Sequence, residues 1–81
     1  MYLTQLYVEN LGISDMTGIE DFVSLNSLSC RGNTISSIDL SNNALLTWLV
    51  IAENDLVKLD VTNNNQLTHL ETHFNLLDSL D

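Results

Sequence analysis

The sequence predicts a solenoid, in which successive windings of the backbone stack on one another and each contributes one short parallel strand. The string Leu-x-x-Leu recurs four times, followed in the first three copies by an apolar residue two positions on, and its starts are 22, 21 and 21 residues apart. A repeat of this length decides the architecture, because each unit can bury its apolar side only against the units next to it. The four copies are Leu3-Leu6-Val8, Leu25-Leu28-Cys30, Leu46-Leu49-Ile51 and Leu67-Leu70-Thr72.

The register extends beyond this string and divides one domain, 1–81, into the units 3–24, 25–45, 46–66 and 67–81. Asparagine stands eight positions after the start in three of the units, and apolar residues stand at ten and thirteen positions in all four. From the first unit to the fourth, these columns read Leu11, Asn33, Asn54 and Asn75; Ile13, Ile35, Leu56 and Leu77; and Met16, Ile38, Leu59 and Leu80.

Length and composition limit what the chain can be. Its 81 residues allow one domain, and hydrophobic residues make up 44% of the chain, which is enough for a core. A formal net charge of −9 disfavours binding to nucleic acid or to an anionic membrane surface. Cys30 is the single cysteine and has no partner for an internal disulfide. We expect no membrane insertion and no signal peptide, because no apolar run approaches about twenty residues and no basic segment precedes an apolar one at the start.

Residues 28–31 and 49–52 alternate with the two-residue period of a strand. This alternation predicts one short strand in each winding, and the four strands would lie parallel. The inward positions are Leu28, Cys30, Leu49 and Ile51, and the intervening side chains, Val50 and Ala52 among them, are expected to point outward.

An asparagine follows the strand in units two to four, where the chain turns away with peptide groups that still need partners. The amide side chain offers two hydrogen-bond donors and an acceptor. We therefore expect Asn33, Asn54 and Asn75 to have a structural role, bonding the backbone of neighbouring windings.

The return half of each unit predicts a second strand-like segment, in which apolar residues flank an acid that points to solvent. These segments are Ile38-Asp39-Leu40, Leu59-Asp60-Val61 and Leu80-Asp81. Turn residues that tolerate positive φ and bond their own backbone follow them, namely Asn42, Asn43, Asn63, Asn64 and Asn65. Residues 14–24 predict one or two turns of a tight helix after a cap at Ser14 or Asp15.

The repeats resemble the leucine-rich repeat family, whose consensus is Leu-x-x-Leu-x-Leu-x-x-Asn/Cys-x-Leu. The segments 25–35, 46–56 and 67–77 match it, as does 3–13 with Leu11 in the asparagine place. The second and third units look like the 21-residue bacterial repeats of internalin-type surface proteins, and the first looks like their 22-residue variety.

This resemblance implies an α/β fold, a right-handed leucine-rich repeat solenoid that forms a horseshoe segment. Its concave face would carry a short parallel β-sheet, and strand-like or short helical return segments would lie on the convex face. The resemblance also favours a bacterial secreted or cell-surface location. One subgroup of the family carries a ladder of cysteines at the place of Cys30, but here Val8, Ile51 and Thr72 fill the other positions of that column.

The outward residues of the strands form the surface that the sequence offers to a partner. Trp48, in the middle of the sheet, is the most informative of them, because aromatic residues and arginine dominate the energetics of interfaces. The family usually binds through the same concave face. We therefore expect a protein partner to bind Tyr7, Arg31, Trp48, Val50, His69, Glu71 and His73. The alternative is that Trp48 and Val50 pack on each other and on Tyr7 without a partner.

Other chemistry receives little support. His69, Glu71 and His73 alternate on one strand face and include zinc and copper ligands, but such residues lie about 6.6 Å apart along a strand, so we predict solvated side chains and no metal. Solvated carboxylates bonded to turn amides are likewise favoured over a calcium site for Asp39, Asp60 and Asp81. We expect Cys30 to be a core side chain. No phosphate-binding loop or nucleophile elbow is present, so the sequence predicts neither an enzyme nor a cofactor.

These observations favour a scaffold for protein–protein recognition. Its first and last windings have no evident polar caps, so several leucine-sized side chains would stay half wetted at each end. We therefore expect a piece of a longer repeat array. The alternative is a structural protein that self-associates head-to-tail into a filament through these uncovered ends.

Overall fold

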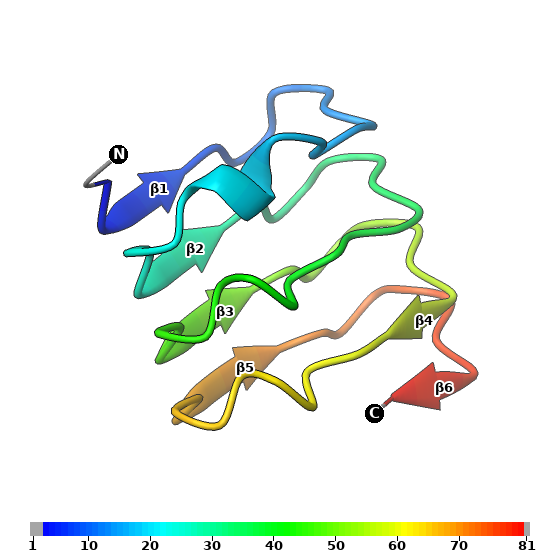
Figure 1. Ribbon diagram of the computed structural model, residues 1–81. Helices are drawn as coiled ribbons and strands as arrows, with labels where there is room; N and C mark the ends of the chain where they lie inside the picture. The colour runs from blue at the N-terminus through cyan, green and yellow to red at the C-terminus, as the bar shows by residue number, and fades with distance from the viewer. Residues whose placement is uncertain (1–2, 81) are drawn as a thin grey trace.

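The computed structural model describes residues 3–80 and contains the predicted stack of windings. Four parallel strands lie one beside the next in the order β1-β2-β3-β5 (Figure 1). The right-handed solenoid with a short parallel sheet is thereby confirmed. The strands of this main sheet are β1 (Gln5–Tyr7), β2 (Ser27–Ser29), β3 (Trp48–Val50) and β5 (His69–Glu71). We call the units 3–24, 25–45, 46–66 and 67–80 coils 1 to 4.

The strands pair in the register of the sequence repeat. The central leucine of each strand lies beside that of the next, from Leu6 to Leu28, Leu49 and Leu70. These leucines point into the space between the main sheet and the return segments, where the core lies. Leu28 and Leu49 are fully buried, whereas Leu6 and Leu70 are partly exposed, because a coil is covered only by its neighbours.

A column of asparagines joins the coils where the chain leaves the main sheet. Asn54 shows the pattern: its Nδ2 donates to Cys30 O at 2.9 Å in coil 2 and to Ile51 O at 3.2 Å in its own coil, and its Oδ1 accepts the Ile35 N–H at 3.0 Å. Asn33 and Asn75 bond the coils before them in the same way. Each asparagine thus provides hydrogen-bond partners for backbone groups that would otherwise be buried without them.

A second asparagine column lies at the opposite corner of the coils, and the sequence analysis missed it. Asn43 is fully buried, and its Nδ2 donates to Ile19 O at 3.0 Å and Phe22 O at 3.1 Å in coil 1. Asn64 is 3% exposed and donates to Leu40 O at 3.1 Å and Asn43 O at 2.9 Å. These side chains bond the preceding coil and not their own backbone, so the expected local role is wrong for both.

The left-handed turn residues lie elsewhere than predicted. Positive φ does not occur at Asn42, Asn43 or 63–65; instead, each coil has a positive-φ residue seven positions after its start, and coil 1 has two more at Gly12 and Gly18. The four residues that share this position are Asn10 (φ 55°), Gly32 (74°), Glu53 (58°) and Phe74 (57°). The chain reverses direction there directly after the strand, while the N–H groups of the first three still donate to the next coil.

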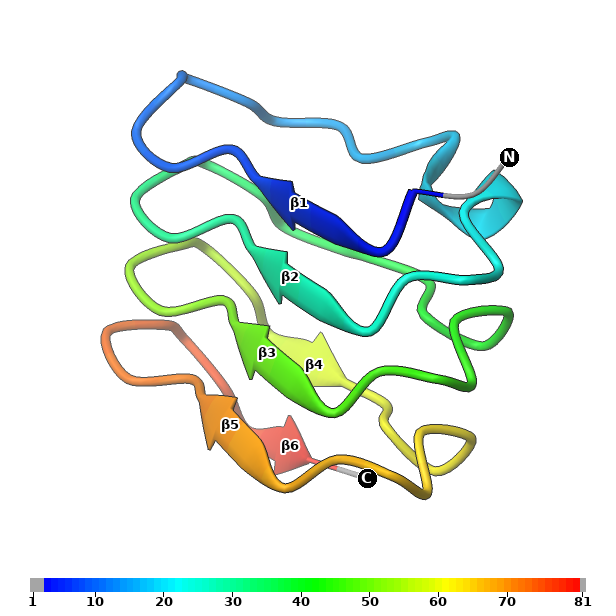
Figure 2. The same cartoon turned by 90° about the vertical axis from the view of Figure 1, so that its left-hand side faces the viewer.

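The return side also differs in detail from the prediction. β4 (Lys58–Leu59) and β6 (Ser79–Leu80) pair in parallel on the side opposite the main sheet (Figure 2). They start one residue earlier than expected, residues 38–40 form no strand, and Asp81 lies outside the described residues. The expected helix is a single 3-10 turn, η1 (Ile19–Asp21), capped by Gly18 at φ 106° and not by Ser14 or Asp15. Within residues 3–80, no helix has the length and apolar character to cross a membrane.

Replacing Asn54 by alanine tests the first asparagine column. We expect Asn54→Ala to lower the free energy of unfolding by about 1–3 kcal/mol, because it leaves the buried Ile35 N–H without an acceptor, whereas the Cys30 carbonyl keeps its bond from Asn33. Asn65→Ala is the matched control, because Asn65 is exposed and should change stability by less than about 0.5 kcal/mol. Urea unfolding followed by circular dichroism measures both, and equal stability of the two variants would contradict the bonding role.

The four left-handed residues that follow the strands give a prediction of opposite sign, because a substitution there should raise the free energy of unfolding. A side chain in the left-handed region costs about 1–2 kcal/mol, and glycine gives back about 0.5–1 kcal/mol of this through its larger loss of entropy on folding. We therefore expect Phe74→Gly to stabilise the chain by about 0.5–1 kcal/mol in urea unfolding. Gly32→Ala should destabilise it, because alanine is strained at φ 74° and its Cβ would also displace the side chain of Asn10. A destabilised Phe74→Gly variant would show that the ring contributes more than the strain it causes.

Candidate recognition face

Three aromatic rings contact one another on the solvent side of the main sheet. Trp48 and His69 occupy paired positions on β3 and β5, and their rings stack with centroids 5.5 Å apart and planes at 10°. Tyr7 approaches Trp48 edge-on from β1, at 6.1 Å and 87°. Both arrangements are favourable for aromatic pairs. Tyr7, Trp48 and His69 therefore form a single ring cluster that extends from β1 to β5.

Small side chains on β2 leave room for the ring cluster. Tyr7 and Trp48 come from the two strands that flank β2, so their rings meet across Ser27 and Ser29. Ser29 is only 2% exposed although it points away from the core. A bulky residue at this position would separate the two rings.

Val50 does not present a surface for a partner. It was expected to be outward and accessible, but it is 3% exposed, and Ala52 is fully buried. An outward direction on a strand does not give exposure where longer side chains on adjacent strands crowd the same face. The predicted face therefore loses Val50, and its accessible apolar area comes from Tyr7, which is 53% exposed, and from the half-buried Trp48.

One imidazole–carboxylate contact and one ion pair lie at the edge of the ring cluster. His69 Nε2 lies 2.6 Å from Glu71 Oε2 on the same strand. Arg31 pairs through Nε with the Oε2 atom of Glu53, a residue that the sequence analysis did not include in the face. Both pairs are exposed, so each contributes only about 0–1 kcal/mol to stability. These contacts orient the side chains, and the pairing with Glu53 neutralises the charge of Arg31 beside the rings.

His73 stands apart from the other predicted residues. Its ring contacts Phe74 edge-on at 5.1 Å in the turn after β5, and both side chains are exposed. The structure thus gathers Tyr7, Trp48, His69 and Glu71, and it places Arg31 and His73 at the margin. Nowhere in residues 3–80 do three metal-binding side chains come together in one group.

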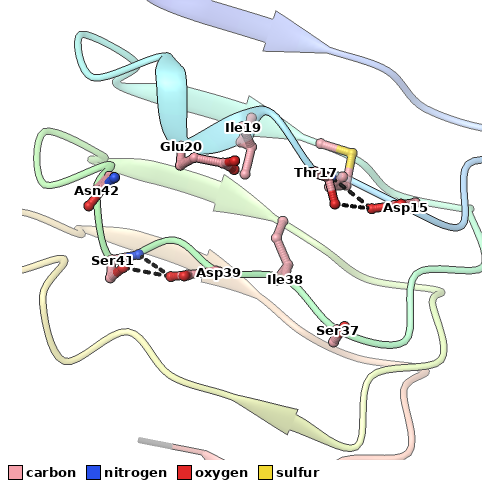
Figure 3. A pocket seen from close by; sticks show the side chains of 10 residues that line it. Asp15, Thr17, Ile19, Glu20, Ser37, Ile38, Asp39, Ser41 and Asn42 are labelled. Atoms are coloured by element: carbon pink, nitrogen blue, oxygen red, sulfur yellow. Dashed lines mark hydrogen bonds between the residues drawn. The ribbon is translucent and has the colours of Figure 1, made fainter.

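The convex side carries an acidic hollow of about 490 Å³ between coils 1 and 2 (Figure 3). Asp15 and Asp39 line it, and each accepts hydrogen bonds from the residue two positions later, Thr17 and Ser41. These bonds, from the hydroxyl and then the N–H, lower the pKa of both carboxyl groups. Both carboxylates therefore already accept hydrogen bonds from residues of their own turns.

Asp60 repeats this turn in coil 3. Its Oδ1 accepts bonds from the N–H and the hydroxyl of Thr62, at 2.9 and 2.7 Å. The bonds lower the pKa of Asp60, and the charge of Asp39 opposes this lowering. The like charges in this column thus repel one another, but local hydrogen bonds outweigh the repulsion.

Cys30 is a core residue. It is fully buried, and its Sγ donates to Val50 O at 3.8 Å. Burial, with a smaller contribution from the charge of Glu9, raises the pKa of the thiol to about 12. A thiol with this pKa stays protonated at neutral pH and is a poor nucleophile.

Comparison with known proteins supports the assignment of the repeats. Over 41 residues, or 51% of the chain, the sequence is 49% identical to Internalin J of Listeria monocytogenes serotype 4b (strain F2365). The fold matches the solved functional domain of InlJ from Listeria monocytogenes, which includes a cysteine ladder, with a TM-score of 0.89 and 40% identity over 98% of the chain. The chain is built of internalin-type leucine-rich repeats. No protein-family model matches it.

These internalin-type repeats span only a small part of the proteins that they match. The matched segment covers 4% of Internalin J, and the fold match covers 20% of the InlJ domain. The InlJ domain includes a cysteine ladder, whereas Cys30 here has Val8, Ile51 and Thr72 as its column neighbours.

The sequence did not predict the roles of Asn43, Asn64 and Glu53 in these repeats. Asn43 and Asn64 were read as turn residues because other asparagines surround them, although both stand three positions before the leucine that starts the next unit. Glu53 gave no signal, because its pairing with Arg31 depends on the left-handed turn that places it.

The buried thiol gives a prediction that depends on pH. The pKa of Cys30 is raised in the folded state from the ordinary 9.0 to about 12, so the stabilisation from the neutral thiol is complete below pH 9 and is lost as the pH rises toward 12. At about pH 8 we expect a thiol reagent to modify the folded chain about a hundredfold more slowly than the chain in guanidinium. Cys30→Val, which copies the neighbouring column residue Val8, should unfold normally and take no label. Rapid labelling of the folded chain would contradict the buried position.

Proposed function

We propose that the chain is a repeat scaffold that recognises a protein partner through the solvent face of its main sheet. The ring cluster of Tyr7, Trp48 and His69 carries this proposal. It combines accessible aromatic area with a backbone held on both sides by hydrogen-bonded coils. Such preorganised aromatic groups lose little conformational entropy on binding, which favours affinity.

The charge of the chain favours a partner with a basic surface. The net charge is −9, and Arg31, the one arginine, is paired with Glu53. Lys58, the one lysine, lies on the return side in β4. The electrostatic field around the sheet face is therefore negative, which accelerates association with cationic surfaces and opposes binding to nucleic acid.

In this proposal, binding is the whole activity, with no catalytic step and no cofactor. Cys30 is buried and protonated, and the carboxylates Asp15, Asp39 and Asp60 are bonded to their own turns. The similarity to Internalin J favours a bacterial protein that is secreted or lies on the cell surface.

Head-to-tail self-association into a filament is the rival function. In favour of it, the outer side of coil 1 has an apolar hollow of about 490 Å³, lined in part by Leu6, Val8 and Met16. Against it, coil 1 carries Leu11 where coils 2 to 4 carry the asparagine that bonds a preceding coil. This second observation leads us to prefer partner recognition.

Removing the central ring tests the proposal. With a partner captured on the immobilised chain and identified by mass spectrometry, we expect Trp48→Ala to weaken binding by about 2 kcal/mol or more, roughly thirtyfold in Kd. Val57→Ala is the control, because it removes an apolar, 42% exposed side chain outside the face. Unchanged affinity of a folded Trp48→Ala variant, or an equal loss in the control, would exclude the sheet face as the binding site.

A further inference from the structure

His69 joins the ring cluster to a carboxylate. Its ring stacks on Trp48 of β3, with centroids 5.5 Å apart and planes at 10°. Its Nε2 atom lies 2.6 Å from Oε2 of Glu71 on the same strand. These two contacts hold the imidazole in place, although 44% of the His69 side chain and 33% of the Glu71 side chain are exposed. Both groups are therefore accessible to protons and to a partner.

The contact with Glu71 determines which nitrogen of His69 changes protonation. An ionised carboxylate can only accept hydrogen bonds, so Nε2 carries a hydrogen whether the imidazole is neutral or charged. The neutral ring has its lone pair on Nδ1, and Nδ1 gains the proton when the imidazole becomes charged. Taking up this proton leaves the hydrogen bond to Glu71 in place and converts it into an ion pair.

Glu71 is the charged side chain within ion-pair distance of His69 among residues 3–80. The strand that pairs with β5 is β3, and its residues 48–50 are uncharged. In the turn that follows β3, the carboxylate of Glu53 is held by Arg31. The charge on His69 therefore acts chiefly on the Glu71 carboxylate and on the indole beneath the imidazole.

A neutral His69 leaves the negative charge of Glu71 available on the sheet face. A carboxylate has about four lone-pair sites, so Glu71 can accept a hydrogen bond from a second donor. The stacked rings of Trp48 and His69 lie beside this carboxylate. Arginine and lysine side chains match the combination, because each has an apolar stem that packs on rings and a charged head that pairs with a carboxylate. The net charge of −9 further favours such a cation.

A charged His69 opposes the same cation. Its positive charge pairs with Glu71 and is attracted by the indole face of Trp48, since the two centroids lie within about 6 Å. An approaching cation then meets a neutralised carboxylate and a like charge beside it, which is unfavourable. Binding of a proton to His69 and binding of a cation to Glu71 therefore weaken each other.

We propose that Glu71 and the ring of Trp48 receive a cationic side chain of a protein partner, arginine or lysine, and that a proton on His69 competes with it. The sheet face then binds a basic partner well at about pH 8 and poorly at about pH 5.5, because histidine changes charge between these values. This inference rests on the proposed function: it names the chemistry of the partner and adds control of its binding by pH.

Trp48 is the one tryptophan of the chain, so its fluorescence reports on the charge of His69. We expect the emission of the free chain to fall as the pH is lowered from about 8 to about 5.5, because a charged imidazole in contact with an indole quenches its fluorescence. His69→Gln should abolish the fall. His73→Gln replaces the other histidine, whose ring contacts Phe74, and should retain it. A constant emission, or a fall that persists in His69→Gln, would overturn the role of His69.

A peptide of four arginines with an amidated C-terminus tests the cationic occupant by calorimetric titration at low salt. At about pH 8 we expect Glu71→Gln to weaken its binding about fivefold or more. Asp78→Asn is the matched control, because it removes one exposed carboxylate on the return side and should have a smaller effect. Absence of binding, or an equal loss in the two variants, would exclude Glu71 as the site of the cation.

The same titration at about pH 5.5 tests the competition. We expect the arginine peptide to bind the unsubstituted chain about fivefold or more weakly than at about pH 8. His69→Gln should remove most of this difference, whereas His73→Gln should preserve it. An equal pH dependence in the chain and in His69→Gln would show that the proton acts elsewhere.

These readouts do not require the natural partner, so the inference and the proposed function fail separately. If Trp48→Ala weakens binding of the captured partner but the arginine peptide is indifferent to Glu71 and to pH, the sheet face recognises a partner of other chemistry and this inference is wrong. If Trp48→Ala leaves the affinity of the captured partner unchanged, the proposed function is wrong whatever the fluorescence of the free chain shows.

Discussion

A backbone group that faces a neighbouring coil must find its hydrogen-bond partner on that coil, because water does not reach the interior of the stack. Strand pairing meets this need over only three residues in each coil of the main sheet. Backbone bonds between coils continue past the strand as far as the left-handed residue, for example from Asn10 N–H to Arg31 O, and the turn that follows leaves a gap in this ladder. Asn33, Asn54 and Asn75 span this gap with one side chain each, because an amide is both donor and acceptor.

The same need explains the rest of the coil. A left-handed residue seven positions after each start reverses the chain early enough for the asparagine to reach back into the preceding coil. The chain accepts Glu53 and Phe74 in this strained conformation, which indicates that the position of the turn matters more than its intrinsic cost. On the return side, Asn43 and Asn64 solve the same problem at the other corner, and their buried Oδ1 atoms are without partners among the described residues.

The sequence alone predicted those features that repeat. Spacing of Leu3, Leu25, Leu46 and Leu67 predicted the stack, the strand register and the inward direction of the leucines, because periodic burial follows directly from periodic coils. It did not predict the burial of Val50, which depends on the bulk of unlike side chains on adjacent strands. Nor did it locate the left-handed turns, since Asn10, Gly32, Glu53 and Phe74 share a backbone conformation but no side-chain chemistry. The ring cluster was predicted in part. The alternation placed its members on one face, but it did not predict the ring contacts across Ser29.

Recognition and stacking use different parts of the same coil, and this separation follows from strand geometry. Side chains on the solvent face, such as Trp48, contact side chains of adjacent strands but take no part in the packing between the sheet and the return segments. Inward leucines and the asparagines are fixed, because every coil must fit the same neighbours. Adding a coil beyond coil 4 would extend the sheet by one strand beside His69 and Glu71 and would leave the contacts of Tyr7 with Trp48 unchanged. A longer array of such repeats therefore enlarges the recognition face without altering the ring cluster at its centre.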